Sequence, residues 1–395
     1  MTNWRLHSAL AIIPWAGLLL AELLLAGFAS AQSGTPEQAL SLESQGRLAE
    51  AAQAWRSVIE QHPNDAAAYA SLGVVLSRQQ KYQEAAAAYG KAIKLNPKLP
   101  GVQLNLGLAE FKQGNFRAAI GPFRAVLADD PKNSQAQTLL GLSYYGSKQF
   151  VEAAKYLKLA AASGAANTEL RQVLAQSCLW AKDYACAQEE FRQILQTDPE
   201  SASAHILSGE ALDGLGKTTE AIEEFRVAAR INPHEPNVHF GIGFLYWKLH
   251  QYDDAQKEFE AELANDPEQG QALAYLGDIE WKNNHPEKAL ELLHRAVQSR
   301  KDIRLAYVDL GAVYTQQKQY DDAVAALRRA VELDPAQADA HYRLGRLYQT
   351  LGNTAAAQKE LEKVRELHST ADEGLVGKIA TAPPPLNESG GSPPQ

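Results

Sequence analysis

Cysteine, basic residues and long apolar runs are all scarce in this sequence of 395 residues. The 2 Cys exclude a small scaffold held by disulfides, and the 27 Gly exclude a collagen-like rod, because both architectures need far more of these residues. The 38 Lys and Arg against 47 Asp and Glu give a net charge of -9, which repels a phosphate backbone. Nucleic acid is therefore not an expected partner. What remains is 45% apolar and long enough for a large folded structure.

The one long apolar run lies at the N-terminus. Residues 1–31 combine a short head containing Arg5 with an apolar segment and the small-residue ending Ala29-Ser30-Ala31, which predicts an export signal cut after Ala31. The alternative is that the segment is not cleaved and anchors the chain in a membrane. Glu22 disfavours this alternative, because it places a carboxylate within the apolar segment. After Gln32 no stretch approaches the roughly 18 apolar residues that a second span needs. The sequence therefore predicts an exported chain, periplasmic or secreted.

From Gln32 the chain repeats with a period of 34 residues. The eighth position of each repeat is Gly or Ala, and the twenty-fourth is bulky and apolar, as in the pair Gly107 and Phe123. The ten repeats are 32–65, 66–99, 100–133, 134–167, 168–201, 202–235, 236–269, 270–303, 304–337 and 338–371. The twentieth position is alanine throughout: Ala51, Ala85, Ala119, Ala153, Ala187, Ala221, Ala255, Ala289, Ala323 and Ala357.

Each repeat is predicted to form a helical hairpin. Apolar residues at positions 4, 7, 8 and 11 mark one face of a first helix, and those at positions 17, 20, 24 and 27 mark one face of a second. The small residues at positions 8 and 20 are expected to let the two helices approach closely where they cross. Position 32 is proline in seven repeats, where it ends the second helix. The fold class is therefore all-α.

On Leu72-Gly73, Tyr82, Ala85, Tyr89, Ala92 and Pro97 and their equivalents, the sequence resembles the tetratricopeptide repeat family. The resemblance implies a right-handed superhelical solenoid of helical hairpins, with a concave groove lined by the first helices. Family members that bind the C-terminal carboxylate of chaperones use Lys and Asn at fixed positions of adjacent repeats, and that set is absent here. Residues 372–395, rich in Pro and Gly, are expected to be a disordered tail.

Apolar residues also occur on the face of the first helices that should be wet. Positions 2, 5, 9, 12 and 13 lie roughly 140° from the buried face, yet they carry large rings in the middle repeats. Because exposed aromatic residues dominate binding sites, these positions are candidates for a partner-binding groove. The alternative is that the rings pack against the neighbouring hairpin and bind nothing. The candidate groove residues are Trp180, Ile206, Phe240, Phe244, Trp247, Lys248, Asp278, Trp281 and Lys282.

Polar residues take the same positions towards the C-terminus. Asp339, Tyr342 and Arg346, with Arg343 beside them, form either a second polar subsite or a solvated face. The mixed charges along the groove suit an extended peptide or an amphipathic helix better than a free anion.

Two thiols, Cys178 and Cys186, lie in the first and second helices of the fifth repeat. They form either a disulfide, which export would permit, or a pair of buried free thiols. His205, His239 and His341 share position 4, where packing is favoured over metal binding. No His-Glu-x-x-His motif occurs, and the repeats leave no room for a catalytic domain. No catalytic residue, metal or cofactor is therefore expected.

The predicted function is a non-catalytic scaffold that binds a peptide or helix of a partner protein in its groove. A structural component of an envelope assembly, bound through its edges and end repeats, is the alternative, by analogy with exported members of the family. A regulatory module of a glycosyltransferase-like system is the third. The partner, the pathway and the oligomeric state are not encoded in any motif.

Overall fold

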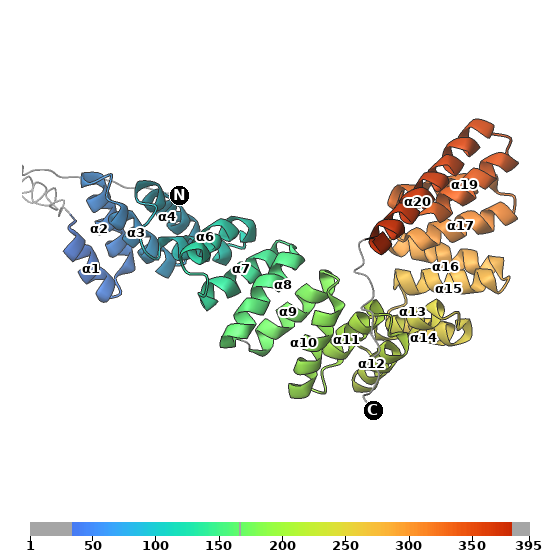
Figure 1. The fold of residues 1–395 in the computed structure, drawn as a ribbon, viewed down its shortest axis with the longest axis horizontal. Helices are drawn as coiled ribbons and strands as arrows, with labels where there is room; N and C mark the ends of the chain where they lie inside the picture. The colour runs from blue at the N-terminus through green and yellow to red at the C-terminus, as the bar shows by residue number, and fades with distance from the viewer. Residues whose placement is uncertain (1–33, 166, 381–395) are drawn as a thin grey trace, which may run out of the picture. The chain divides into compact units, whose positions relative to one another are not determined.

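A computed structural model describes residues 34–165 and 167–380 of the chain. The signal predicted over 1–31 lies outside these residues. The described chain divides into two compact units, one through Ser177 and one from Cys178. Within the described residues there are helices and connecting turns and no β-strand, and within each unit consecutive helices lie side by side (Figure 1).

In the part of the chain that the structure describes, twenty α-helices form ten hairpins, one within each of the ten 34-residue repeats. Each repeat supplies an odd-numbered first helix and an even-numbered second helix, as predicted. The first eight helices are α1 (Pro36–Ser44), α2 (Leu48–Gln61), α3 (Ala66–Arg78), α4 (Tyr82–Leu95), α5 (Val102–Lys112), α6 (Phe116–Asp129), α7 (Ser134–Gly146) and α8 (Phe150–Ala160), followed by a π-helical turn η1 (Ala161–Ala165). The others are α9 (Thr168–Trp180), α10 (Tyr184–Thr197), α11 (Ala202–Gly214), α12 (Thr218–Ile231), α13 (Val238–Lys248), α14 (Tyr252–Asn265), α15 (Gly270–Lys282), α16 (Pro286–Ser299), α17 (Arg304–Gln316), α18 (Tyr320–Leu333), α19 (Ala338–Thr350) and α20 (Thr354–Ala380).

The alanine column forms the buried seam of every hairpin. All ten alanines at position 20 are 2% exposed or less. The glycine at position 8 makes room for the bulky residue at position 24 of its own repeat. A Cβ on Gly107 would lie 2.5 Å from the ring of Phe123, and one on Gly311 would lie 2.5 Å from Leu327. The prediction of close packing at positions 8 and 20 is therefore confirmed. The side chain at position 24 occupies the space that the missing side chain of the glycine leaves.

Every hairpin turns through a residue with positive φ at position 15. Four repeats use glycine there, such as Gly114, but six use a residue with a side chain, such as Lys148 and Asn284. The left-handed conformation favours glycine, so this turn is strained in the six repeats that lack it. The sequence alone did not reveal the shared conformation, because the residue types in the column differ.

Helices α5 and α13 have 11 residues, fewer than the 13 of α3, and both follow a proline. Pro100 precedes Gly101, and Pro236 precedes Asn237; both second residues have positive φ and cap helices of 11 residues, α5 and α13. The buried carboxylate of Glu262 on α14 accepts hydrogen bonds of 3.0 Å from the backbone N–H groups of Asn237 and Phe240. These bonds satisfy donors that the start of a helix leaves free.

The C-terminal segment departs from the prediction. Helix α20 continues past 371 to Ala380, so the expectation of a disordered tail from Asp372 does not hold for 372–380. The reason is compositional, since the first proline of the tail is Pro383 and nothing before it stops a helix. Residues 381–395 lie outside the described part of the chain.

Three histidines at position 4 pair within their own hairpins. The Nδ1 atoms of His205, His239 and His341 lie 2.6, 2.7 and 2.6 Å from a carboxylate oxygen of Glu224, Glu258 and Glu360, which share position 23. The prediction that they serve packing between helices agrees with this geometry, and the pairs explain the histidines without a metal.

Candidate functional site

Three aromatic residues of α13 form a ladder of rings. Phe240, Phe244 and Trp247 follow one another at 6.3 Å between centroids, with adjacent planes within 21° of parallel. Tyr275 of α15 lies edge-on to Trp247 and Phe244, at 4.9 and 5.6 Å. All three ladder rings are half-buried. The rings therefore pack on the neighbouring hairpin, as the alternative interpretation expected, and still keep part of their surface in solvent.

Asp278 is the candidate that the structure places differently from the prediction. It was expected on the wet face, but it is 2% exposed. The indole N–H of Trp247 donates to it at 2.6 Å, and the ammonium group of Lys282 pairs with its other oxygen. The ring ladder covers the carboxylate, so it is not available to touch a partner directly. Its contacts instead hold the Trp247 indole and the Lys282 side chain in place.

The two lysines of the candidate set are exposed and lie against the ladder. Lys248 forms an ion pair of 2.5 Å with Asp213 of α11, and its ammonium group lies 6.0 Å from the centre of the Phe244 ring. Lys282 lies 5.5 Å from the Trp247 ring. Both arrangements are cation–π contacts, so the lysines fix the polar border of the aromatic surface.

An acidic hollow of about 180 Å³ opens between α11 and α13. Its walls are apolar, and two carboxylates stand at the edge. Asp213 is paired with Lys248, whereas Glu210 forms no hydrogen bond or ion pair with the described residues. Partial desolvation raises the pKa of the Glu210 carboxyl. The lining residues are Ile206, Glu210, Asp213, Phe225, Asn237, Phe240, Gly241, Phe244 and Leu245.

An arginine hollow of about 340 Å³ lies on α15, α17 and α19. Trp281 and Tyr342 supply aromatic walls, and Tyr342 is 52% exposed. Arg346 donates only to the neutral side chain of Gln349, at 3.0 Å, and Arg343 forms no hydrogen bond or ion pair with the described residues. The lining residues are Trp281, Gly311, Ala312, Thr315, Tyr342, Arg343, Arg346, Leu347 and Thr350. The side chains at 342, 343 and 346 thus share one hollow with Trp281.

A buried acid adjoins the arginine hollow. Asp309 of α17 is 3% exposed, and its Oδ2 atom has no hydrogen-bond partner. Burial, together with repulsion from Asp278, raises the pKa of Asp309 to about 8; the positive charges of Lys282, Arg343 and Arg304 offset part of this effect. The raised pKa favours the neutral form of Asp309, which reduces the negative charge that this carboxyl presents to Arg343.

The remaining candidates take separate places. Ile206 lines the acidic hollow and Trp281 lines the arginine hollow, while Trp180 is 49% exposed and lines neither. Sequence reasoning missed Tyr275 and Asp309, which both occupy position 6 of their repeats. Position 6 lies within about 20° of position 13 on a helical projection, so widening the predicted face by one residue would have found both.

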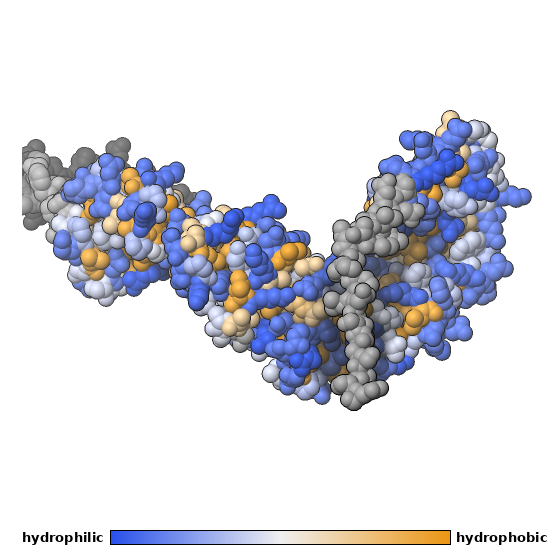
Figure 2. All heavy atoms as spheres, in the orientation of Figure 1, coloured by the Kyte–Doolittle hydropathy of each residue, from blue (hydrophilic) through white to orange (hydrophobic). Residues whose placement is uncertain are grey.

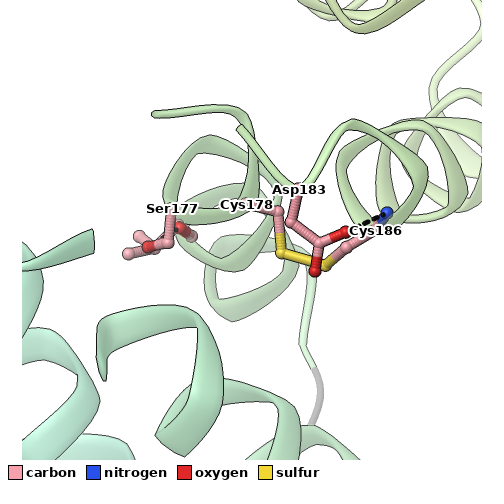
Figure 3. The surroundings of a disulfide bond; sticks show 5 residues. Ser177, Cys178, Asp183 and Cys186 are labelled. Atoms are coloured by element: carbon pink, nitrogen blue, oxygen red, sulfur yellow. Dashed lines mark hydrogen bonds between the residues drawn. A yellow bond between two sulfur atoms is a disulfide. The ribbon is translucent and has the colours of Figure 1, made fainter. Parts of the chain in front are cut away.

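Cys178 and Cys186 form a disulfide, which is one of the two alternatives that the sequence left open. The bond joins the last turn of α9 to the first turn of α10, with the Cα atoms 5.8 Å apart (Figure 3). Asp183 lies beside it and accepts a hydrogen bond from the Cys186 N–H at 3.3 Å. These are the only three residues, within the part of the chain that the structure describes, whose ligand atoms cluster as a metal site would need. Both sulfur atoms are already bonded to each other.

Loss of the disulfide is expected to destabilise the fifth hairpin. Closing a loop of this length is worth about 2–3 kcal/mol in the chain-entropy account. Reduction of the native protein should lower its denaturation midpoint, and the Cys178→Ser, Cys186→Ser variant should start low and be insensitive to reductant. Thiol titration of the unreduced, denatured protein checks the bond directly. Two reactive thiols per chain in that measurement would contradict the disulfide.

The surface of the described chain is mainly hydrophilic, with apolar residues in separate patches on the face shown in Figure 2. Among the described residues no helix combines the length and the apolar content required to cross a membrane.

Comparisons with known proteins cover most of the chain. Residues 35–171 match the family model of the cytochrome c-type biogenesis protein H TPR domain. Residues 174–236 and 241–303 match a model described as tetratricopeptide repeat, residues 311–352 match a TPR repeat model, and residues 338–367 match another tetratricopeptide repeat model. No curated protein sequence matches the chain significantly.

Several solved structures are similar to the chain. The APC/C hetero-tetramer Cut9–Hcn1 matches at 14% identity over 84% of this chain and 80% of that chain, with a TM-score of 0.51, which shows a shared fold. YrrB, described as a TPR protein with an unusual peptide-binding site, matches at 25% identity over 49% of this chain and 100% of its own, with a TM-score of 0.37. PilW, a type IV pilus biogenesis factor, matches at 23% identity over 51% and 94%, with a TM-score of 0.45.

Proposed function

Because this chain is a tetratricopeptide repeat protein, an all-α solenoid of a kind that generally serves protein–protein interaction without catalysis, we propose that it is a non-catalytic scaffold that binds a linear segment of a partner protein. The segment lies along the first helices of the second unit. The contact surface has three parts. They are the ring ladder of α13, the acidic hollow between α11 and α13, and the arginine hollow on α15, α17 and α19. We call this the first-helix surface.

The observation that carries the proposal is the combination of half-exposed rings with two hollows that are lined mainly by first helices. Phe244 contributes to the acidic hollow and Trp281 to the arginine hollow, and both keep part of their surface in solvent. Large rings with an apolar hollow beside them are the anchors that dominate protein interfaces. Lys248 and Lys282 supply the polar border that such anchors have in known interfaces. The apolar surface that these rings leave exposed is typical of a site where a partner binds.

An exported setting is part of the proposal. It rests on the signal predicted over 1–31 and on the match of residues 35–171 to the TPR domain of a cytochrome c-type biogenesis protein. The disulfide between Cys178 and Cys186 suits an oxidising compartment. A fusion of residues 1–31 to a reporter enzyme that is active only after export tests this directly. An inactive reporter would place the chain inside the cell.

Removing two anchors should weaken partner binding while the fold persists. The variant Phe244→Ala, Trp281→Ala is preferred to a change at Trp247, because loss of the indole N–H would leave the Oδ2 atom of the buried Asp278 without its donor. The partner is first captured from the native host by crosslinking, and its dissociation constant is then measured with purified components. We expect a loss of about 2 kcal/mol or more, which is roughly thirtyfold in affinity.

The matched control is Tyr320→Ala, which removes a half-buried ring from a second helix, α18. Its affinity should be unchanged, and thermal unfolding should show all three proteins folded. Equal affinity of the anchor variant and the wild type would overturn binding at the first-helix surface. Hydrogen exchange with the partner bound distinguishes binding at the first-helix surface from the alternative, in which the chain is a structural component bound through its end repeats. Protection of α13 and α15 supports the proposal, whereas protection confined to the terminal hairpins favours an assembly component bound through its ends.

A further inference from the structure

The first-helix surface carries charges of opposite sign at its two hollows. Glu210 and Asp213 stand at the acidic hollow, and Arg343 and Arg346 stand at the arginine hollow. Glu210, Arg343 and Arg346 have no opposite charge in an ion pair among the described residues, so each hollow has an uncompensated charge next to apolar walls. An uncompensated charge beside an apolar pocket favours a ligand that brings the opposite charge and an apolar group together.

We propose that this surface selects its partner by the order of charges along one segment. A basic residue next to an aliphatic or aromatic one enters the acidic hollow, and an acidic residue next to an aliphatic or aromatic one enters the arginine hollow. The occupant is thus a polarised linear segment of a protein, held in one direction. The inference rests on the function proposed above and adds to it the class and the orientation of the ligand.

The arginine hollow is built to accept a carboxylate. Arg343 and Arg346 are three residues apart on α19 and therefore project from the same face of the helix. Burial and the Asp278 charge raise the pKa of the buried Asp309, which favours its neutral form, so it cancels little of the Arg343 charge. Trp281 and Tyr342 provide flat apolar walls for the side chain that accompanies the carboxylate. Guanidinium groups bind carboxylates in a planar, two-pronged manner, which adds direction to the contact.

The acidic hollow is the smaller and more apolar of the two. Ile206, Phe240 and Phe244 form walls that fit one aliphatic or aromatic side chain. A cationic group of the ligand would stabilise the Glu210 carboxylate, because this carboxylate is partly desolvated and unpaired. The neighbouring Asp213 already forms such an ion pair with Lys248. A Lys or Arg of the ligand would take the place at Glu210 that Lys248 takes at Asp213.

The separation of the hollows sets the spacing in the ligand. The acidic hollow lies between α11 and α13, and the arginine hollow involves α15, α17 and α19, so about two to three interhelix steps of roughly 10 Å lie between them. An extended chain advances about 3.3 Å per residue, which places the two charged pairs roughly six to nine residues apart. A segment with both charges at adjacent positions cannot reach both hollows.

The test is a selection from a random twelve-residue peptide display library on the full-length protein. The proposal expects the enriched peptides to carry a basic–apolar pair and an acidic–apolar pair, always in the same order. Synthetic peptides from that selection should bind the Arg343→Glu, Arg346→Glu variant at least tenfold more weakly. Changing the acidic residue of the peptide to lysine should restore most of the affinity for this variant. The Glu210→Lys variant should likewise bind these peptides more weakly, and changing the basic residue of the peptide to an acidic one should restore most of the affinity.

The matched controls reverse charge outside the first-helix surface. Arg365→Glu on α20 and Glu60→Lys on α2 change exposed residues of second helices, and both should leave peptide affinity unchanged. Enriched peptides without a fixed order of charges, or no rescue by the reversed peptide, would overturn this inference while the proposed function stands. Failure of the library to yield any peptide whose binding depends on Phe244 and Trp281 would overturn both.

Discussion

Gly107→Ala is expected to destabilise the third hairpin by about 1–3 kcal/mol, whereas Gly90→Ala in the second hairpin is expected to stabilise that hairpin by about 0.5–1 kcal/mol. A Cβ at Gly107 would lie 2.5 Å from the Phe123 ring, and that ring is fully buried. Because the ring is fully buried in close packing, it has little room to move away from an added methyl group. A Cβ at Gly90 meets nothing within 4 Å, so only the higher helix propensity of alanine is felt there.

The comparison is made by chemical denaturation followed by far-ultraviolet circular dichroism. Both glycines lie inside helices, Gly107 in α5 and Gly90 in α4, so the opposite signs isolate the effect of the close contact from the effect of helix propensity. The difference between the two variants is the quantity to report, because a repeat array need not unfold in one step. Midpoints that shift in the same direction and by similar amounts would show that the contact at position 8 has no cost.

The stability of the second unit should fall as pH rises from about 5 to about 8, and Asp309 should account for a large part of the fall. The raised pKa of this carboxyl, about 8 against 3.8 for an ordinary Asp, means that between these values the folded state holds a proton that the unfolded state has released. Each pH unit in that window therefore costs up to about 1.4 kcal/mol, a few kcal/mol in total, and the loss levels off above pH 8.

The variant Asp309→Asn carries no titrating group at this site and should lose most of that pH dependence. The charged groups that act on Asp309 are Asp278 and Lys282 on α15, Arg304 on its own helix and Arg343 on α19. Asp321→Asn on α18 changes an exposed acid and is the control for the general effect of net charge. Denaturation midpoints at pH 5 and pH 8.5 for the three proteins decide the matter. A parallel decline in the wild type and Asp309→Asn would show that Asp309 is ionised throughout.

Much of the candidate site was visible in the sequence because helical periodicity identifies the faces of a single helix. Phe240, Phe244 and Trp247 were predicted to share a face, and they do form one ladder. Asp278 shows where that reasoning stops. Its position on the helix is on the same face, but Trp247 of the neighbouring hairpin covers it. Periodicity gives a direction from one helix axis, and it says nothing of what a neighbouring hairpin places in that direction.

The disulfide and the turns show the same limit in a different way. Cys178 and Cys186 are close in sequence, yet their pairing depends on the exact approach of two antiparallel helices. The positive φ at position 15 holds for Lys148 as well as for Gly114, because the path between the helices imposes it on whichever residue is there. Neither feature follows from residue type.

What the sequence determined by itself is the hairpin unit, its ten copies and the helix faces that meet inside each copy. Those features depend on contacts between residues fewer than 34 positions apart, and a recurring pattern of small and bulky side chains is enough to specify them. Only the tertiary structure decided which first-helix residues are buried, as Asp278 and Asp309 are, and which stay open, as Tyr342 and Arg343 do. The physical reason is that stacking between hairpins depends on the side chains of both partners at once. Burial, charge compensation and the two hollows are therefore properties of pairs of repeats.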